Sequence, residues 1–133
     1  LNVEGTTLGV ETIKTVDFTV STPNDTNAKT TDVAVTATIT GKILTMLDDG
    51  TEGTVDLAKW AMITSDKAEC YKNVTIQSIA AGQVVREYTM PTAFVVDYNE
   101  NYDDVEGVGT FTLVVRQKKD KIGTITVNGG YEA

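Results

Sequence analysis

Alternation of β-branched and polar residues limits the fold of this chain more than any other feature of its sequence. In residues 32–44, apolar side chains recur at every second position up to Gly41, and threonine fills most positions between them. These apolar side chains are Val33, Val35, Ala37, Ile39 and Ile43. A period of two puts one set on each face of a pleated strand, and β-branched residues suit such a surface. The sequence therefore predicts a mainly β protein.

Further strands follow from the same pattern. Residues 13–21 alternate so that Val16, Phe18 and Val20 share one face, which we expect to be buried. The tract 22–31 interrupts the pattern with side chains that form local hydrogen bonds, so we expect an exposed loop there. These side chains include Pro23, Asn24, Asp25 and Asn27. Gly41 is expected at a bulge or bend.

Two hairpins are expected in the second half of the chain. The first covers residues 74–88, turns at Ala81 and Gly82, and is ended by Met90 and Pro91. In the second hairpin, residues 93–98 pair with residues 109–117. A last short strand is expected over 123–127.

One helix is expected at about 55–63, where the apolar period changes. Leu57, Ala58, Ala61 and Met62 recur with helical spacing, and Thr54 or Asp56 would cap the first turn. The helix should lie flat against a sheet. A chain of 133 residues is long enough for one domain with a substantial core.

Composition argues against several functional classes. The net charge of −8 and a pI of about 4.4 should repel phosphate backbones, so we expect no nucleic-acid recognition. The chain has no histidine and one cysteine, Cys70, which removes the usual catalytic triads, zinc clusters and internal disulfides. Cys70 is expected to be a buried, inert thiol.

Membrane insertion is also not expected. No apolar run approaches the roughly 20 residues that span a bilayer, and the first residues lack the basic and apolar regions of a signal peptide. We therefore expect a soluble protein.

A dense acidic cluster lies between the strands of the second hairpin. It contains Asp97, Glu100, Asp103, Asp104 and Glu106. A calcium loop that begins at Asp97 would need glycine at its sixth position and glutamate at its twelfth, but the chain has Tyr102 and Val108 there. A solvated loop or a contact surface between subunits fits the cluster better. Glycoside hydrolysis is not expected, because the chain lacks a clustered aromatic platform beside the acids.

The tract 116–121 holds the clustered positive charge, with Arg116, Lys118 and Lys119. It can be the solvated end of a strand, or it can protect a sheet edge from uncontrolled pairing. A third interpretation sets it against the acidic cluster of a neighbouring copy, because opposite charges on different edges favour head-to-tail assembly into rings.

Together these segments resemble a known family. The strand TDVAVTATITGKI, the helix DLAKWAMI, and the paired AFVVDY and GVGTFTL within residues 71–133 resemble the tube protein of contractile injection systems. That family includes the haemolysin-coregulated protein of type VI secretion and phage tail tube proteins. The resemblance implies two packed antiparallel sheets in a β-barrel or sandwich with one helix at its side. It also implies hexameric rings that stack into a hollow tube, with no cofactor and no catalysis.

Two functional hypotheses follow. In the first, the chain is a single tube-protein domain, residues 1–133, with an extended N-terminal arm. It would meet its own copies, as well as sheath, baseplate or spike proteins, through loop 22–31, the acidic cluster and the basic tract. The tube would be assembled in the cytoplasm and then belong to an injection particle, a virion or a secreted tube. In the second, the chain is a small extracellular β-sandwich module whose acidic residues 97–106 bind calcium or a basic partner.

Overall fold

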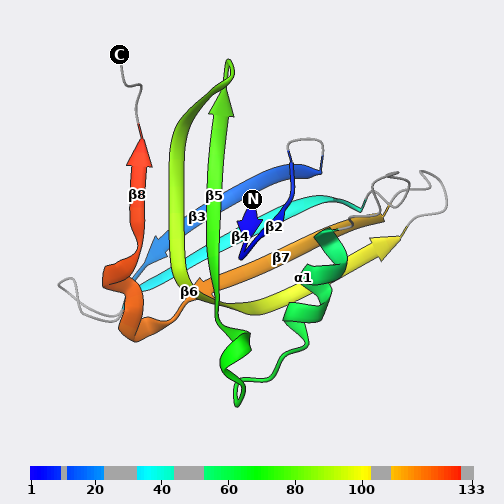
Figure 1. Ribbon diagram of the computed structural model, residues 1–133, viewed down its shortest axis with the longest axis vertical. Helices are drawn as coiled ribbons and strands as arrows, with labels where there is room; N and C mark the ends of the chain where they lie inside the picture. Colours follow the sequence, from blue (N-terminus) through cyan, green and yellow to red (C-terminus); the bar gives the residue numbers. More distant parts are fainter. Residues whose placement is uncertain (10–11, 23–32, 44–52, 103–108, 130–133) are drawn as a thin grey trace.

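The computed structural model describes residues 1–9, 12–22, 33–43, 53–102 and 109–129. Figure 1 shows its elements in chain order. They are β1 (Asn2–Val3), β2 (Thr6–Thr7), β3 (Ile13–Ser21), β4 (Ala34–Ile43), α1 (Gly53–Ala61), η1 (Ala68–Cys70), β5 (Lys72–Ala80), β6 (Gln83–Tyr102), β7 (Gly109–Gln117), η2 (Lys119–Thr124) and β8 (Thr126–Gly129).

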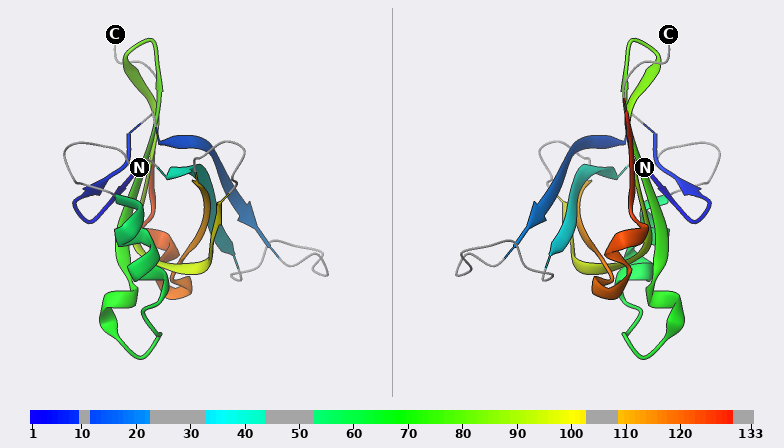
Figure 2. Two further views of the ribbon diagram at one scale, coloured as in Figure 1. Left: turned by 90° about the vertical axis from the view of Figure 1, so that its right-hand side faces the viewer. Right: turned by 90° about the vertical axis from the view of Figure 1, so that its left-hand side faces the viewer.

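All eight described strands belong to one antiparallel sheet that bends into two layers (Figure 2). Its order is β2-β1-β5-β6-β7-β4-β3, and β8 also pairs with β6. The 20-residue strand β6 belongs to both layers, because its first part pairs with β5 and β8 and its second part pairs with β7. We call β2, β1, β5, β8 and the first part of β6 the hairpin layer, and we call the second part of β6 with β7, β4 and β3 the four-stranded layer. The expected antiparallel two-layered β fold with one helix is confirmed, and the two layers are continuous through β6.

The core lies between the layers and follows from the alternation in the sequence. In β4 and β7 every second side chain is buried; Ile39 is paired with Leu113, and Ala37 with Val115. Leu57 and Trp60 of α1 pack on this face together with Val74 and Met90 of the hairpin layer. Burying such side chains contributes roughly 1.5–3 kcal/mol each relative to exposure.

Gly41 is closely surrounded by neighbouring backbone and side-chain atoms. It sits in regular register opposite Phe111, and the bulge that we expected near it occurs across the ladder in β3, between Ile13 and Thr15. A Cβ atom on Gly41 would lie 2.5 Å from the carbonyl oxygen of Thr12 and 2.6 Å from the ring of Phe111. Glycine is therefore required here by close approach.

The helix α1 begins and ends two residues before the expected range. Thr54 is buried within its first turn, so neither Thr54 nor Asp56 is the residue that precedes the helix. Leu57 is buried as the spacing predicted and Trp60 is buried beside it, but Met62 follows the last helical residue and is 74% exposed. Cys70 is buried as expected, and its carbonyl oxygen accepts a hydrogen bond from Trp60 Nε1 at 2.7 Å.

The first hairpin turns at the predicted residues but does not end where expected. Ala81 and Gly82 both have positive φ, as a tight two-residue turn requires. Met90 and Pro91 do not end the strand, since β6 continues to Tyr102. Proline has no N–H to give to a ladder, and Pro91 is tolerated because the β5–β6 register shifts opposite it, between Lys72 and Val74.

The expected burial of one face of β3 is wrong. Val16 and Val20 are 37% and 51% exposed, and Phe18 is half-buried against Tyr88, with ring centroids 4.0 Å apart. The reason is position, because β3 is the last described strand of the four-stranded layer, and Val16 and Phe18 line an open groove of about 850 Å³ between β3 and the β5–β6 hairpin. The last strand, β8, begins three residues later than expected, after the short helix η2.

The N-terminal residues do not form the extended arm that we expected. Strands β1 and β2 fold into a small hairpin, and β1 also pairs with β5. Val3 and Leu8 are buried in the core. Of loop 22–31, only Thr22 is among the described residues, and the assignment of residues 1–133 to one domain stays a prediction. Within the described ranges, no helix combines the length and apolar character needed to cross a membrane.

Candidate assembly surfaces

Among the described residues, the four-stranded layer has an open edge on each side. On one side β3 pairs with β4, and no other described strand pairs with it. On the other, β6 pairs with β7, but β5 leaves β6 at Ala93, so no described strand pairs with the second edge of residues 94–102. Open edges present unpaired N–H and C=O groups that can add another strand. The layer can therefore be extended in both directions.

The outer face of the four-stranded layer is polar and rich in hydroxyl groups. It carries the side chains that alternate with the core residues, and these are exposed or half-buried. They include Thr15, Asp17, Thr19, Thr36, Thr38, Thr40, Asn99, Asn101, Thr110 and Thr112. Phe94 and Val114 lie on the same face and are half-buried, and polar side chains outnumber them among the described residues, so the face can remain in contact with solvent.

Asp97 and Glu100 belong to β6 rather than to a loop, which corrects the expected acidic loop 97–106. Asp97 pairs with Val114 on the outer face, whereas Glu100 pairs with Phe111 on the core face. The Glu100 carboxylate accepts hydrogen bonds from the hydroxyls of Tyr98 at 2.6 Å and Tyr102 at 2.9 Å. Because the two acids point to opposite faces, they cannot ligate one ion together.

The remaining members of the acidic cluster, Asp103, Asp104 and Glu106, lie outside the described residues, as do Pro23, Asn24, Asp25 and Asn27. Among the residues that are described, no group of three or more His, Cys, Asp or Glu side chains could hold a metal ion. The described geometry gives the calcium-binding hypothesis no support.

The basic tract begins at the end of β7, five residues along the strand from Phe111, the partner of Glu100, but Asp97 pairs with Val114, two residues before Arg116. Arg116 is exposed, and its Nε donates to Thr36 Oγ1 at 3.2 Å. Lys118 pairs with Asp120 at 3.5 Å and lies 5.5 Å from the centre of the Tyr71 ring, and Lys119 is the first residue of η2. The nine residues of β7 span roughly 30 Å at 3.3–3.4 Å per residue. The two ends of β7 are therefore too far apart for side chains at Gly109 and at Gln117 to contact each other.

Two apolar surfaces escaped the sequence analysis. One is at the turn of the β5–β6 hairpin, where Ile79 and Val84 form a cross-strand pair and are 49% and 43% exposed. The other is a hollow of about 480 Å³ along the open edge of β6, beside α1. Met62 and Val96 line it and are 74% and 44% exposed. The sequence could have predicted the first surface, because apolar residues stand on both sides of the Ala81-Gly82 turn.

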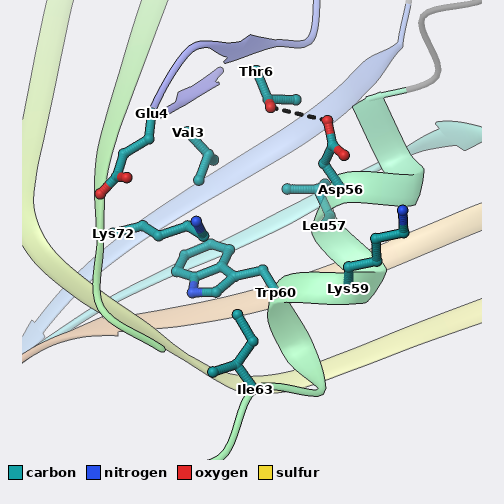
Figure 3. A pocket seen from close by; sticks show the side chains of 9 residues that line it. All are labelled: Val3, Glu4, Thr6, Asp56, Leu57, Lys59, Trp60, Ile63 and Lys72. Carbon is teal, nitrogen blue, oxygen red and sulfur yellow. Dashed lines mark hydrogen bonds between the residues drawn. The ribbon is translucent and has the colours of Figure 1, made fainter. Parts of the chain in front are cut away.

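A smaller pocket of about 290 Å³ lies between α1 and the N-terminal hairpin (Figure 3). Trp60 and Leu57 line it, and its carboxylates already hold the N-terminal hairpin in place. Thr6 Oγ1 donates to Asp56 at 3.1 Å, and Glu4 accepts from the backbone N–H of Asn73 at 2.9 Å. These contacts connect β1 and β2 to α1 and β5. The pocket therefore has a structural role that its hydrogen bonds explain.

The fold indicates a general kind of protein. A bent antiparallel sheet with two open edges and one helix beside it suits a subunit that extends its sheet through copies of itself. No family model matches the chain. No curated protein matches it either.

Solved structures do match. The chain is similar to the structure of Hcp1 from Flavobacterium johnsoniae, with a TM-score of 0.62, 18% identity, and coverage of 99% of this chain and 96% of that one. It is also similar to the tube-terminating cap of the anti-feeding prophage, with a TM-score of 0.52, 12% identity, and coverage of 90% and 76%. A chain of the anti-feeding prophage baseplate gives a TM-score of 0.52, 14% identity, and coverage of 92% and 82%. The resemblance to tube proteins of contractile injection systems is confirmed at the level of the fold.

Proposed function

We propose that this protein is a structural subunit that assembles into rings, and that the rings stack into the hollow tube of a contractile injection system. The observation that carries the proposal is the pair of open edges on the four-stranded layer, found in a chain with the fold of tube and tube-cap proteins. The subunit has a structural role and catalyses no reaction. The ring is hexameric in this proposal.

Strand directions support an edge-to-edge joint. Neighbouring strands alternate in direction through β6, β7, β4 and β3, so β3 runs opposite to β6. A ring axis roughly parallel to the strands preserves the direction of β6 from copy to copy. The β3 edge of one copy then meets the β6 edge of the next in antiparallel orientation, which can form a regular ladder. Residues 94–98 and 110–115 thereby belong to a continuous sheet that surrounds the channel. The polar face of this sheet, which points away from the core of each subunit, lines the channel.

Charge supports contacts between copies at the ends of β7. In this proposal the acidic residues Asp97, Glu100, Asp103 and Asp104 face the basic end of a neighbouring copy. The basic end contains Arg116, Lys118 and Lys119. Loop 22–31, with Pro23, Asn24, Asp25 and Asn27, meets the adjacent ring. Contacts between two different surfaces of one subunit generate closed rings or open filaments.

Other parts of a particle are further partners in this proposal. One similar structure is a tube-terminating cap and another is part of a baseplate. We therefore place the protein in a particle where its tube contacts sheath, baseplate or spike components. Assembly would precede the incorporation of the tube into a secreted particle or virion.

Electron microscopy of the purified protein tests the proposal directly. Rings or tubes with a central channel are expected, and their fraction should rise with protein concentration. Sedimentation velocity across concentration and salt gives an independent measure of mass. A species that stays strictly monomeric under all these conditions would overturn the proposed function.

A further inference from the structure

The turn end of the β5–β6 hairpin projects from the body of the protein with apolar residues uncovered. We define the hairpin tip as residues 78–86. Figures 1 and 2 show it extending away from the four-stranded layer, far from α1. Ile79 and Val84 face one another across its two strands and are about half-exposed. Two-stranded hairpins are marginally stable alone, so these residues are suited to packing against a partner.

The hollow beside α1 has the complementary composition. Ala58, Ala61 and Met62 line it from the helix side, and Val95, Val96, Asp97, Tyr98 and Glu100 line it from β6. Its charged residues are both acidic. The hairpin tip contains one charged residue, Arg86, and no acid. An apolar tip with a cation therefore matches an apolar hollow with an acidic rim.

Both surfaces lie beside the edges that the proposed ring brings together. The hairpin stands next to β3, since Ile79, Val85 and Arg86 line a groove of about 850 Å³ together with Val16 and Phe18 of β3. The hollow lies along the open edge of β6, at the opposite side of the four-stranded layer. Joining β3 of one copy to β6 of the next therefore brings the hairpin tip of the first copy towards the hollow of the second.

We propose that the hairpin tip of one copy packs into the α1–β6 hollow of the next copy. This inference rests on the proposed function and names the contact that locks the edge joint. Ile79 and Val84 cover Met62 and Val96, and Arg86 pairs with Asp97 at the rim of the hollow. Since tip and hollow are different surfaces, each copy gives one tip and receives another, as ring closure requires.

Cysteine cross-linking tests the contact in the full chain. The background is Cys70→Ala, because Cys70 is the native cysteine, and the test variant adds Val84→Cys and Met62→Cys. Oxidation of the assembled protein should give a ladder of disulfide-linked multimers on a non-reducing gel. The matched control pairs Val84→Cys with Lys67→Cys, since Lys67 is exposed and does not line the hollow; it should stay monomeric on the gel. If Val84→Cys does not fold, Gln83→Cys takes its place.

Substitutions in the hollow and in the hairpin tip give a second test of the contact. Met62→Asp should raise the concentration needed for half-assembly about tenfold or more, because it removes apolar burial and adds charge beside acids. Arg86→Glu should also weaken assembly, whereas Lys67→Glu, with the same change in net charge, should not. Assembled rings that neither cross-link nor respond to Met62→Asp would overturn this contact and leave the proposed function intact. A wild-type protein that never assembles would overturn both.

Discussion

At the residue scale, Gly41 shows how closely neighbouring segments of the four-stranded layer approach each other. Its missing side chain makes room for the ring of Phe111 on one strand and for the carbonyl group of Thr12 on the segment before β3. We predict that Gly41→Ala lowers the free energy of unfolding by about 1–3 kcal/mol, since overpacking a tight core forces neighbouring backbone and rings apart. Chemical denaturation of the monomer measures this loss.

Gly123→Ala is the matched control for that change. Nothing lies within 4 Å of the Cβ position at Gly123, so its free energy of unfolding should stay within about 0.5 kcal/mol of wild type. Equal losses at both positions would show that glycine flexibility, rather than close approach at Gly41, determines the effect.

At the element scale, the buried side chain of Gln117 holds the end of the chain on the sheet. Its Oε1 accepts from the backbone N–H of Thr92 at 3.2 Å, and its Nε2 donates to the carbonyl oxygen of Lys121 at 3.0 Å. Gln117→Leu leaves both backbone groups without this partner. We predict a loss of about 1–3 kcal/mol in unfolding free energy, with faster amide exchange in η2 and β8 measured by NMR.

Gln77→Leu is the control at this scale. Gln77 also donates a side-chain hydrogen bond, to Glu87 at 2.7 Å, but it is exposed. Its replacement should change the unfolding free energy by less than about 0.5 kcal/mol. If Gln117→Leu proves equally neutral, then the attachment of η2 does not depend on this amide.

Periodicity predicted individual elements better than it predicted their environment. It placed β3, β4, α1, the turn of the first hairpin and the strands of the second to within a few residues, because local alternation determines which side chains share a face. It could not show that Val16 and Val20 remain exposed, since the covering layer is set by tertiary packing. A related limit applies to the acids, because strand alternation puts Asp97 and Glu100 on opposite faces only once β6 is known to continue through both.

At the scale of the whole molecule, the proposed pairing of the acidic residues near the end of β6 with the basic residues near the end of β7 can be tested without knowing the atomic contacts. One variant carries Glu100→Lys, Asp103→Lys and Asp104→Lys, so that both ends are basic. Another carries Arg116→Glu, Lys118→Glu and Lys119→Glu, so that both ends are acidic. Each variant alone should fold but assemble poorly, because every contact between copies then joins like charges. Circular dichroism checks the fold, and sedimentation velocity measures assembly.

Mixing the two variants in equal amounts should restore assembly, because an alternating order places an acidic end against a basic end at every contact. An alternating ring closes only with an even number of subunits, so the proposed hexamer should form closed rings in electron micrographs. A ring with an odd number would instead give open arcs. Raising the salt concentration should weaken the mixed assembly, since exposed charges are screened over about 10 Å at 0.1 M. A mixture that stays monomeric would contradict pairing between the ends of β7, whatever the fold of the separate variants.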